Sequence, residues 1–188
     1  TLTFRNDTRQ TALPMREIGS FKLGECVGGA HTHWAGQARR YLPWDFETKS
    51  RTVERYGARQ MPEDCTSQDW GISFEELEPY YDQFEQIFGV CGKAGNLNGE
   101  LQPGGNPFEG PRSREFPNPP SPQTYGGALF AQAAASLGYH PHPSPSAAMS
   151  QPYTNLYRQH LGQCVHGGFC NGHLCATGAK ATPYTAIL

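Results

Sequence analysis

Ser73-Phe-Glu-Glu-Leu-Glu-Pro-Tyr-Tyr-Asp-Gln-Phe-Glu-Gln-Ile-Phe-Gly89 carries the strongest secondary-structure signal in the chain. Ser73 followed by Glu76 is a capping box, in which each side chain accepts a hydrogen bond from the other residue's backbone N–H. Apolar side chains then recur every three or four residues and predict one buried helical stripe: Phe74, Leu77, Tyr81, Phe84 and Phe88. Pro79 cannot donate to the preceding turn, which predicts a short first turn and a main helix starting near Pro79. Gly89 is a typical stop.

Outside this helix, long irregular segments surround one further helical stretch. Residues 92–124 are dominated by Gly, Pro and Asn and predict a long loop. An Ala-rich helix is expected over residues 122–137, capped by Ser121. Residues 47–60 carry charges at helical spacing, typical of either a short solvated helix or a loop. The expected fold class is an α+β fragment with two main helices, near 74–88 and 122–137, long Gly/Pro-rich loops and a few short strands.

The composition excludes some functions. Only 37% of the 188 residues are hydrophobic, which is low for a compact globular protein. The 22 Gly and 16 Pro are typical of long irregular segments that depend on other parts of a structure instead of forming a regular core of their own. A net charge of -2 gives no electrostatic case for nucleic-acid binding. No apolar run approaches the roughly 18 residues of a membrane span, and no signal-peptide pattern opens the chain. Because it begins at Thr1 without Met and stops at Leu188, we expect a fragment of a longer polypeptide; a mature chain or a complete domain is the alternative.

Half of the six cysteines lie in one short Gly-rich stretch, Cys164-Val-His-Gly-Gly-Phe-Cys170-Asn-Gly-His-Leu-Cys175. Thiolates at this spacing can wrap a [3Fe–4S] cluster, or a four-iron cluster with one ligand from elsewhere. Zinc is the main alternative, because His166 and His173 lie between the cysteines and Cys3His is a valid structural zinc site. The cysteine spacing lacks the C-x2-C pair that is typical of zinc sites, which argues against zinc. Disulfides or free thiols remain open as well.

A second motif lies far upstream, at Gly24-Glu-Cys-Val-Gly-Gly-Ala-His-Thr-His-Trp-Ala-Gly36. Paired glycines let a backbone approach a flat ligand closely, and Trp34 with His31 and His33 could flank an aromatic ring system. This pattern is typical of a flavin-contacting loop, but a simple tight turn next to a Trp would give it too. A flavin and a metal cluster in one polypeptide would indicate electron transfer.

Five segments occur in an order that resembles the glucose–methanol–choline (GMC) oxidoreductases, and among them the bacterial gluconate, glucose, sorbitol and fructose dehydrogenase large subunits. The resemblance covers most of residues 20–188, and its most specific parts are the run from Gly105 to Arg114 and the cysteine stretch. In chain order, the segments are Gly24 to Phe46, Trp70-Gly-Ile-Ser-Phe-Glu-Glu-Leu-Glu-Pro-Tyr-Tyr-Asp82, Gly89-Val-Cys-Gly-Lys-Ala-Gly-Asn-Leu97, Gly105-Asn-Pro-Phe-Glu-Gly-Pro-Arg-Ser-Arg-Glu-Phe-Pro117, and Cys164 to Lys180.

The resemblance implies FAD, a [3Fe–4S] cluster and oxidation of a sugar, polyol or sugar-acid (aldonate) hydroxyl. It implies that hydride goes to the flavin and that single electrons leave through the cluster to a cytochrome or quinone acceptor. It also implies a peripheral position on the periplasmic side of the bacterial inner membrane, with a small escort subunit and a cytochrome c subunit. The implied cofactor-binding residues are Gly28, Gly29, Thr32, His33, Trp34 and Ala35, and the implied metal ligands are Cys164, Cys170 and Cys175.

The chain departs from the family pattern in three ways. The dinucleotide fingerprint and the His-containing catalytic segment both lie outside it, so no residue here is assigned as catalytic and the chain alone is expected to be inactive. Gly167 stands where some relatives would carry a further Cys, which favours three ligands over four. We expect one internal fragment over residues 1–188, with a flavin-contacting region (20–46), a cap or substrate-side region (70–150) and a cysteine cluster loop (160–182). A non-catalytic structural zinc-binding or interaction module is the alternative.

Overall fold

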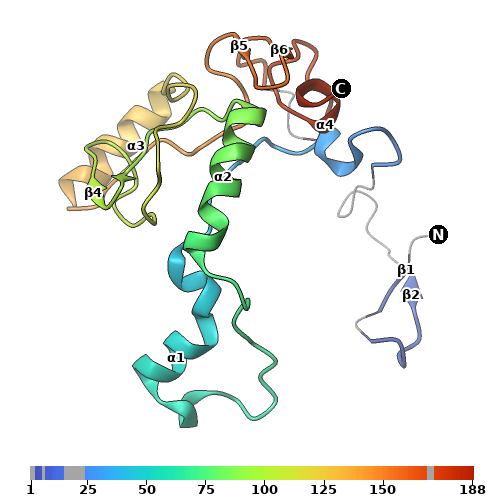
Figure 1. Cartoon of the computed structure of the whole chain (residues 1–188), viewed down its shortest axis with the longest axis vertical. Coiled ribbons are helices and arrows are strands. Elements are labelled where there is room, and N and C mark those ends of the chain that lie inside the picture. Colours follow the sequence, from blue (N-terminus) through green and yellow to red (C-terminus); the bar gives the residue numbers. More distant parts are fainter. Residues whose placement is uncertain (1–2, 6, 15–23, 169–171) are drawn as a thin grey trace.

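The computed structural model describes residues 3–5, 7–14, 24–168 and 172–188 (Figure 1). Its helices are α1 (Thr48–Tyr56), α2 (Phe74–Phe88), α3 (Tyr125–Ser136) and α4 (Pro183–Ala186), with 3-10 turns at Gly29–Thr32, Pro43–Glu47 and Ala58–Gln60. Three antiparallel two-residue pairs join β1 (Thr3–Phe4) to β2 (Leu13–Pro14), β3 (Asn96–Leu97) to β4 (Glu100–Leu101), and β5 (Tyr153–Thr154) to β6 (His160–Leu161). The expected small α+β architecture, with long loops and short strands, is confirmed.

Helix α2 forms where the sequence predicts it, and its caps are those of the capping box. Ser73 Oγ accepts from the Glu76 N–H at 3.2 Å, and Glu76 Oε2 accepts from the Ser73 N–H at 2.7 Å. Gly89 ends the helix in the left-handed conformation, at φ 60°. The prediction that the main helix starts near Pro79 is wrong, because α2 is continuous from Phe74. Pro79 and Glu75, whose carbonyl Pro79 cannot bond, are both exposed, so water can satisfy that carbonyl.

The other helices are less buried than α2. Helix α3 begins at Tyr125 instead of residue 122, because Thr124 and not Ser121 provides the cap, its Oγ1 accepting from the Gly127 N–H at 3.1 Å. Of the two alternatives for residues 47–60, the short solvated helix is right for Thr48–Tyr56. Neither α1 nor α3 contributes a buried residue. Within the described part of the chain, no helix combines the length and apolar character that a membrane crossing requires.

The core forms around residues 145–149, which pair through single bridges with three distant segments. The Cys91 and Ser146 N–H groups each donate to the other residue's carbonyl, at 2.8 and 2.9 Å. The Ala147 N–H donates to Gly36 O at 2.7 Å, and Ala147 O accepts from the Ala181 N–H at 2.8 Å. The upstream Gly-rich loop, the end of α2 and the C-terminal segment therefore meet. The buried cluster comprises Phe88, Val90, Phe116, Ala147, Met149, Leu161, Ala181 and Ala186.

A buried ion network fastens the chain after the Gly-rich loop to α2. Glu85, on α2, receives hydrogen bonds from Arg40 Nε at 2.8 Å and Arg40 Nη2 at 2.9 Å, and from Arg112 Nη2. Arg40 Nη1 also bonds Glu78 Oε1 at 3.0 Å. The Arg112 guanidinium lies 3.6 Å from the centre of the Phe116 ring. Glu85 and Arg112 are almost inaccessible to solvent, so this network belongs to the core.

Candidate functional site

The Gly-rich loop folds as a tight turn that only glycine accommodates. Gly28 and Gly29 both have positive φ, at 93° and 55°, a region that residues with a side chain rarely adopt. A Cβ at Gly24 would lie 2.2 Å from the carbonyl carbon of Gly29, so the loop closes on itself there. Thr32 Oγ1 donates to Gly29 O at 3.0 Å and stabilises the turn. The loop thus presents half-buried backbone without side chains at Gly28 and Gly29.

Trp34 anchors this loop in the core. Its Nε1–H donates to Ala181 O at 2.9 Å, and its ring makes edge contacts with Phe88 at 6.5 Å and with His31 at 5.0 Å between ring centroids. The side chain is half-buried. A ligand could therefore meet only the exposed part of the indole, because the rest is committed to packing.

His33 presents a buried nitrogen without a partner. Within the part of the chain that the structure describes, His33 Nε2 is inaccessible to water and makes no hydrogen bond. Buried polar atoms are nearly always paired, so an orphaned one indicates a missing partner such as a ligand. The neighbouring Thr32 is buried and Ala35 is exposed. The six predicted cofactor residues thus form one continuous loop with an unmet hydrogen-bonding group.

The structure describes two of the three predicted metal ligands. Cys164 and Cys175 are free and half-buried, while Cys170 lies outside the described residues. The Cys164 N–H donates to Met149 O at 2.9 Å, which attaches the start of the cysteine segment to the core. Among residues 3–5, 7–14, 24–168 and 172–188, no three His, Cys, Asp or Glu side chains are gathered as a metal site would require. The three-cysteine site therefore stays a prediction.

The environment of Cys175 favours its thiolate. Burial raises the pKa of this thiol, but hydrogen bonds from the Thr177 hydroxyl and from the backbone N–H groups of Lys180, Thr177 and Ala179 outweigh burial, so the pKa of Cys175 lies below its ordinary value. The Sγ–Oγ1 distance to Thr177 is 3.4 Å. Thiolates, not thiols, are metal ligands and nucleophiles. The chemistry of Cys175 thus fits the donor that a metal cluster needs.

We expect Cys175 in the metal-free protein to react with iodoacetamide at lower pH than an unassisted thiol. Replacing Thr177 by Val removes one hydrogen bond to the thiolate and should move the pH midpoint of Cys175 alkylation upward. Peptide-level mass spectrometry across a pH series measures this midpoint. Exposed Cys65 serves as the internal control, and its pH profile should be identical in both proteins. An unchanged midpoint for Cys175 in the Thr177→Val variant would contradict the assignment.

Lys180 joins the two motifs, and sequence reasoning missed its role. Its Nζ donates to Trp34 O and to His173 O, at 2.7 Å in both cases. The Gly172 N–H donates to His33 O at 2.9 Å and makes a second link. The Gly-rich loop and the cysteine segment, far apart in sequence, are thereby neighbours. The sequence feature that could have indicated this role is a single Lys among small residues in Ala176-Thr-Gly-Ala-Lys-Ala-Thr182.

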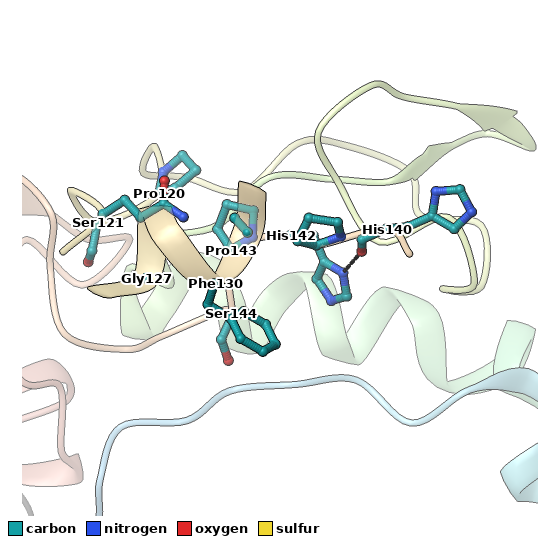
Figure 2. Close-up of a pocket in the computed structure, with 11 residues that line it drawn as sticks. Pro120, Ser121, Gly127, Phe130, His140, His142, Pro143 and Ser144 are labelled. Atoms are coloured by element: carbon teal, nitrogen blue, oxygen red, sulfur yellow. Dashed lines mark hydrogen bonds between the residues drawn. The ribbon is translucent and has the colours of Figure 1, made fainter. Parts of the chain in front are cut away.

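Among the concave surfaces of the described chain, one borders the Gly-rich loop and another lies along α3. A cleft of about 350 Å3 separates residues 34–40 from α2, and Trp34, Tyr80 and Phe84 contribute to its walls. A larger groove of about 730 Å3 lies between α3 and residues 140–144 (Figure 2). Phe130 and His142 line this groove, where His142 Nδ1 is 3.1 Å from His140 O. No predicted site residue lines the larger groove, whereas Trp34 borders the smaller one.

Comparison with known proteins gives relatives along the whole chain, although no family model matches it. The chain is 44% identical to the gluconate 2-dehydrogenase flavoprotein of Pantoea cypripedii, aligned over 100% of this chain and 31% of that protein. It is 35% identical to the fructose dehydrogenase large subunit of Gluconobacter japonicus (81% of this chain, 23% of that protein). It is 36% identical to the 2-methyl-1,2-propanediol dehydrogenase of Mycolicibacterium austroafricanum (67% of this chain, 19% of that protein).

The chain therefore spans less than a third of the length of these relatives. The region aligned with the Pantoea cypripedii flavoprotein includes the positions of both motifs, since that alignment covers the chain throughout. The resemblance expected from the motifs is confirmed: the chain belongs to the GMC oxidoreductase family and corresponds to one part of its larger flavoproteins.

Proposed function

We propose that this chain is part of an FAD-dependent dehydrogenase that oxidises a sugar, polyol or sugar-acid hydroxyl and passes the electrons through an iron–sulfur cluster to a cytochrome or quinone acceptor. The observation that carries the proposal is the contact between the Gly-rich loop and the cysteine segment through Lys180 and His33. If one segment contacts a flavin and the other holds a metal cluster, their direct contact would place the two cofactors close together and give electrons a short path between them. Two of the relatives are named for the oxidation of a sugar or a sugar acid.

The residues proposed to hold FAD are Gly28, Gly29, Thr32, His33, Trp34 and Ala35. The positive-φ glycines leave the backbone of the turn without side chains, and the orphaned His33 Nε2 offers a hydrogen bond to a bound group. Trp34 holds the loop in place through Ala181. When bound, FAD would supply hydride acceptance from the substrate carbon. The chain's own part in this reaction is to bind and orient the ring, and the proton acceptor comes from outside it.

The residues proposed to hold a [3Fe–4S] cluster are Cys164, Cys170 and Cys175. The lowered pKa of Cys175 supports a thiolate ligand, and N–H groups directed at a ligand sulfur are among the features that tune cluster potential. Such a cluster would supply one-electron transfer. Among the described residues no three-ligand group is present for either kind of site, and Cys170 lies outside them. No observation favours the structural zinc module over the cluster.

The proposal extends to the assembly. The Gluconobacter japonicus relative is named a large subunit, which supports further subunits in the complete enzyme. We propose a small escort subunit and a cytochrome c subunit, and a peripheral position on the periplasmic side of the inner membrane. Because the chain covers less than a third of its relatives, we propose that it has no dehydrogenase activity by itself.

Cofactor analysis of the full-length flavoprotein tests this proposal. The protein is purified without oxygen, and flavin, iron, acid-labile sulfide and zinc are measured. We expect one flavin and roughly three irons per chain. Replacing Cys164, Cys170 or Cys175 by Ser should abolish iron binding while substrate still bleaches the flavin. The matched control Cys65→Ser, at an exposed cysteine, should keep its iron. Stoichiometric zinc without iron, or absence of flavin, would refute the proposal.

A further inference from the structure

Lys180 has an environment that is unusual for lysine. Its side chain is 1% exposed, and lysine is almost never fully buried unless it is paired. The residue lies in an extended segment that pairs with the core, with an antiparallel bridge between Lys180 and Ala148 and a hydrogen bond from the Met149 N–H to Ala179 O at 2.9 Å. The backbone of Lys180 is thus fixed, and its side chain extends from a rigid base.

The ammonium group of Lys180 connects the two motifs directly. It donates to Trp34 O in the Gly-rich loop and to His173 O in the cysteine segment, both at 2.7 Å. Such short, charge-assisted hydrogen bonds are the stronger ones in proteins. A Cβ on Gly36 would lie 3.7 Å from Lys180 Cγ, so the aliphatic stem passes beside the loop backbone. One side chain therefore bridges two segments that are far apart in the sequence.

The backbone next to Lys180 adds a contact to the same junction. Ala181 O accepts from Trp34 Nε1 at 2.9 Å on the loop side. The direct link from the Gly172 N–H to His33 O runs parallel to these contacts. Residues 180–181 thus contact the loop and the cysteine segment at once, through side chain and backbone.

We propose that Lys180 is a positioning residue that holds the flavin-contacting loop and the cysteine segment in one fixed arrangement. The inference rests on the proposed function for the cofactors that the two segments carry. The arrangement itself rests on the hydrogen bonds of Lys180. Loss of the ammonium group should loosen both segments together, because each loses a carbonyl contact to the same donor.

Hydrogen exchange in the full-length flavoprotein tests this. Lys180→Met keeps an unbranched side chain of similar length and removes the donor. We expect exchange to accelerate about tenfold or more in residues 33–36 and in 172–180, the size expected when a hydrogen bond to a charged group is lost. Exchange in α2 should not change. The control Lys49→Met removes an exposed lysine on α1 and should leave both segments as they are.

Metal content gives a second readout. In Lys180→Met we expect iron per flavin to fall while most of the flavin is retained, because the Trp34 indole still ties the Gly-rich loop to Ala181 O. Unchanged exchange in either segment, or equal acceleration throughout the protein, would overturn the positioning role. If the wild-type protein binds no iron, the proposed cluster fails, and the exchange comparison still decides the role of Lys180.

Discussion

Replacing Glu85 by Met should destabilise the folded protein by about 3–5 kcal/mol, the usual cost of removing one partner from a buried ion pair. Glu85 is 2% exposed and is the shared acceptor for Arg40 and Arg112. Its removal leaves the Arg112 guanidinium buried without its main carboxylate partner, since Glu109 Oε2 is 3.9 Å away. A guanidinium cannot shed its proton to relieve this cost. The free energy of unfolding, from guanidinium titration followed by circular dichroism, measures the effect.

A double variant separates the buried charge from simple loss of packing. In Glu85→Met with Arg112→Met both charges go, so the loss should be smaller than the sum of the two single losses, because replacing a buried pair by apolar groups is often close to neutral. Glu47→Gln is the matched control, since its pair with Arg51 is on the surface and should contribute little. Additive losses in the double variant would contradict the proposed coupling.

Local patterns predicted the helices well because their determinants are close in sequence. The capping pair Ser73 and Glu76 and the stop at Gly89 are all within one segment, and all three act as predicted. The start of α3 was missed by three residues because Ser121 and Thr124 are both acceptable caps, and the chain uses the second. The predicted helix start near Pro79 was wrong because the effect of this proline depends on whether the unbonded carbonyl of Glu75 reaches water. A sequence pattern does not show this.

The candidate site shows the opposite case. Gly28 and Cys175 could be proposed as site residues from the sequence, because a glycine pair and a group of closely spaced cysteines are recognisable as local patterns. Lys180 and Glu85 could not, because their roles depend on distant partners: Trp34 lies 146 residues from Lys180, and Arg112 lies 27 residues from Glu85. A lysine that donates to two backbone carbonyls leaves no complementary charge in the sequence to detect. Long-range hydrogen bonds of this kind become visible only when the chain is folded.

Trp34 should be the most sensitive position in the Gly-rich loop. We expect Trp34→Ala to destabilise the protein by about 3 kcal/mol, the lower part of the range for large aromatic deletions, because the side chain is half-buried. Trp34→Phe keeps a ring against Phe88 but leaves Ala181 O without its donor, which should cost about 1–2 kcal/mol. Circular dichroism is the suitable probe, because the substitutions remove a fluorophore.

Trp34→Ala should also lower flavin binding at temperatures where the variant is still folded. The indole ties the loop to Ala181, beside Lys180, so its removal should release the backbone around His33 and lower the flavin content of the full-length enzyme even below its unfolding temperature. Trp44→Ala is the matched control, because Trp44 is 57% exposed and should tolerate truncation with little change. Normal flavin content in Trp34→Ala would contradict this prediction. It would show that the hydrogen bonds from Lys180 to Trp34 O and from Gly172 to His33 O are sufficient to hold the loop.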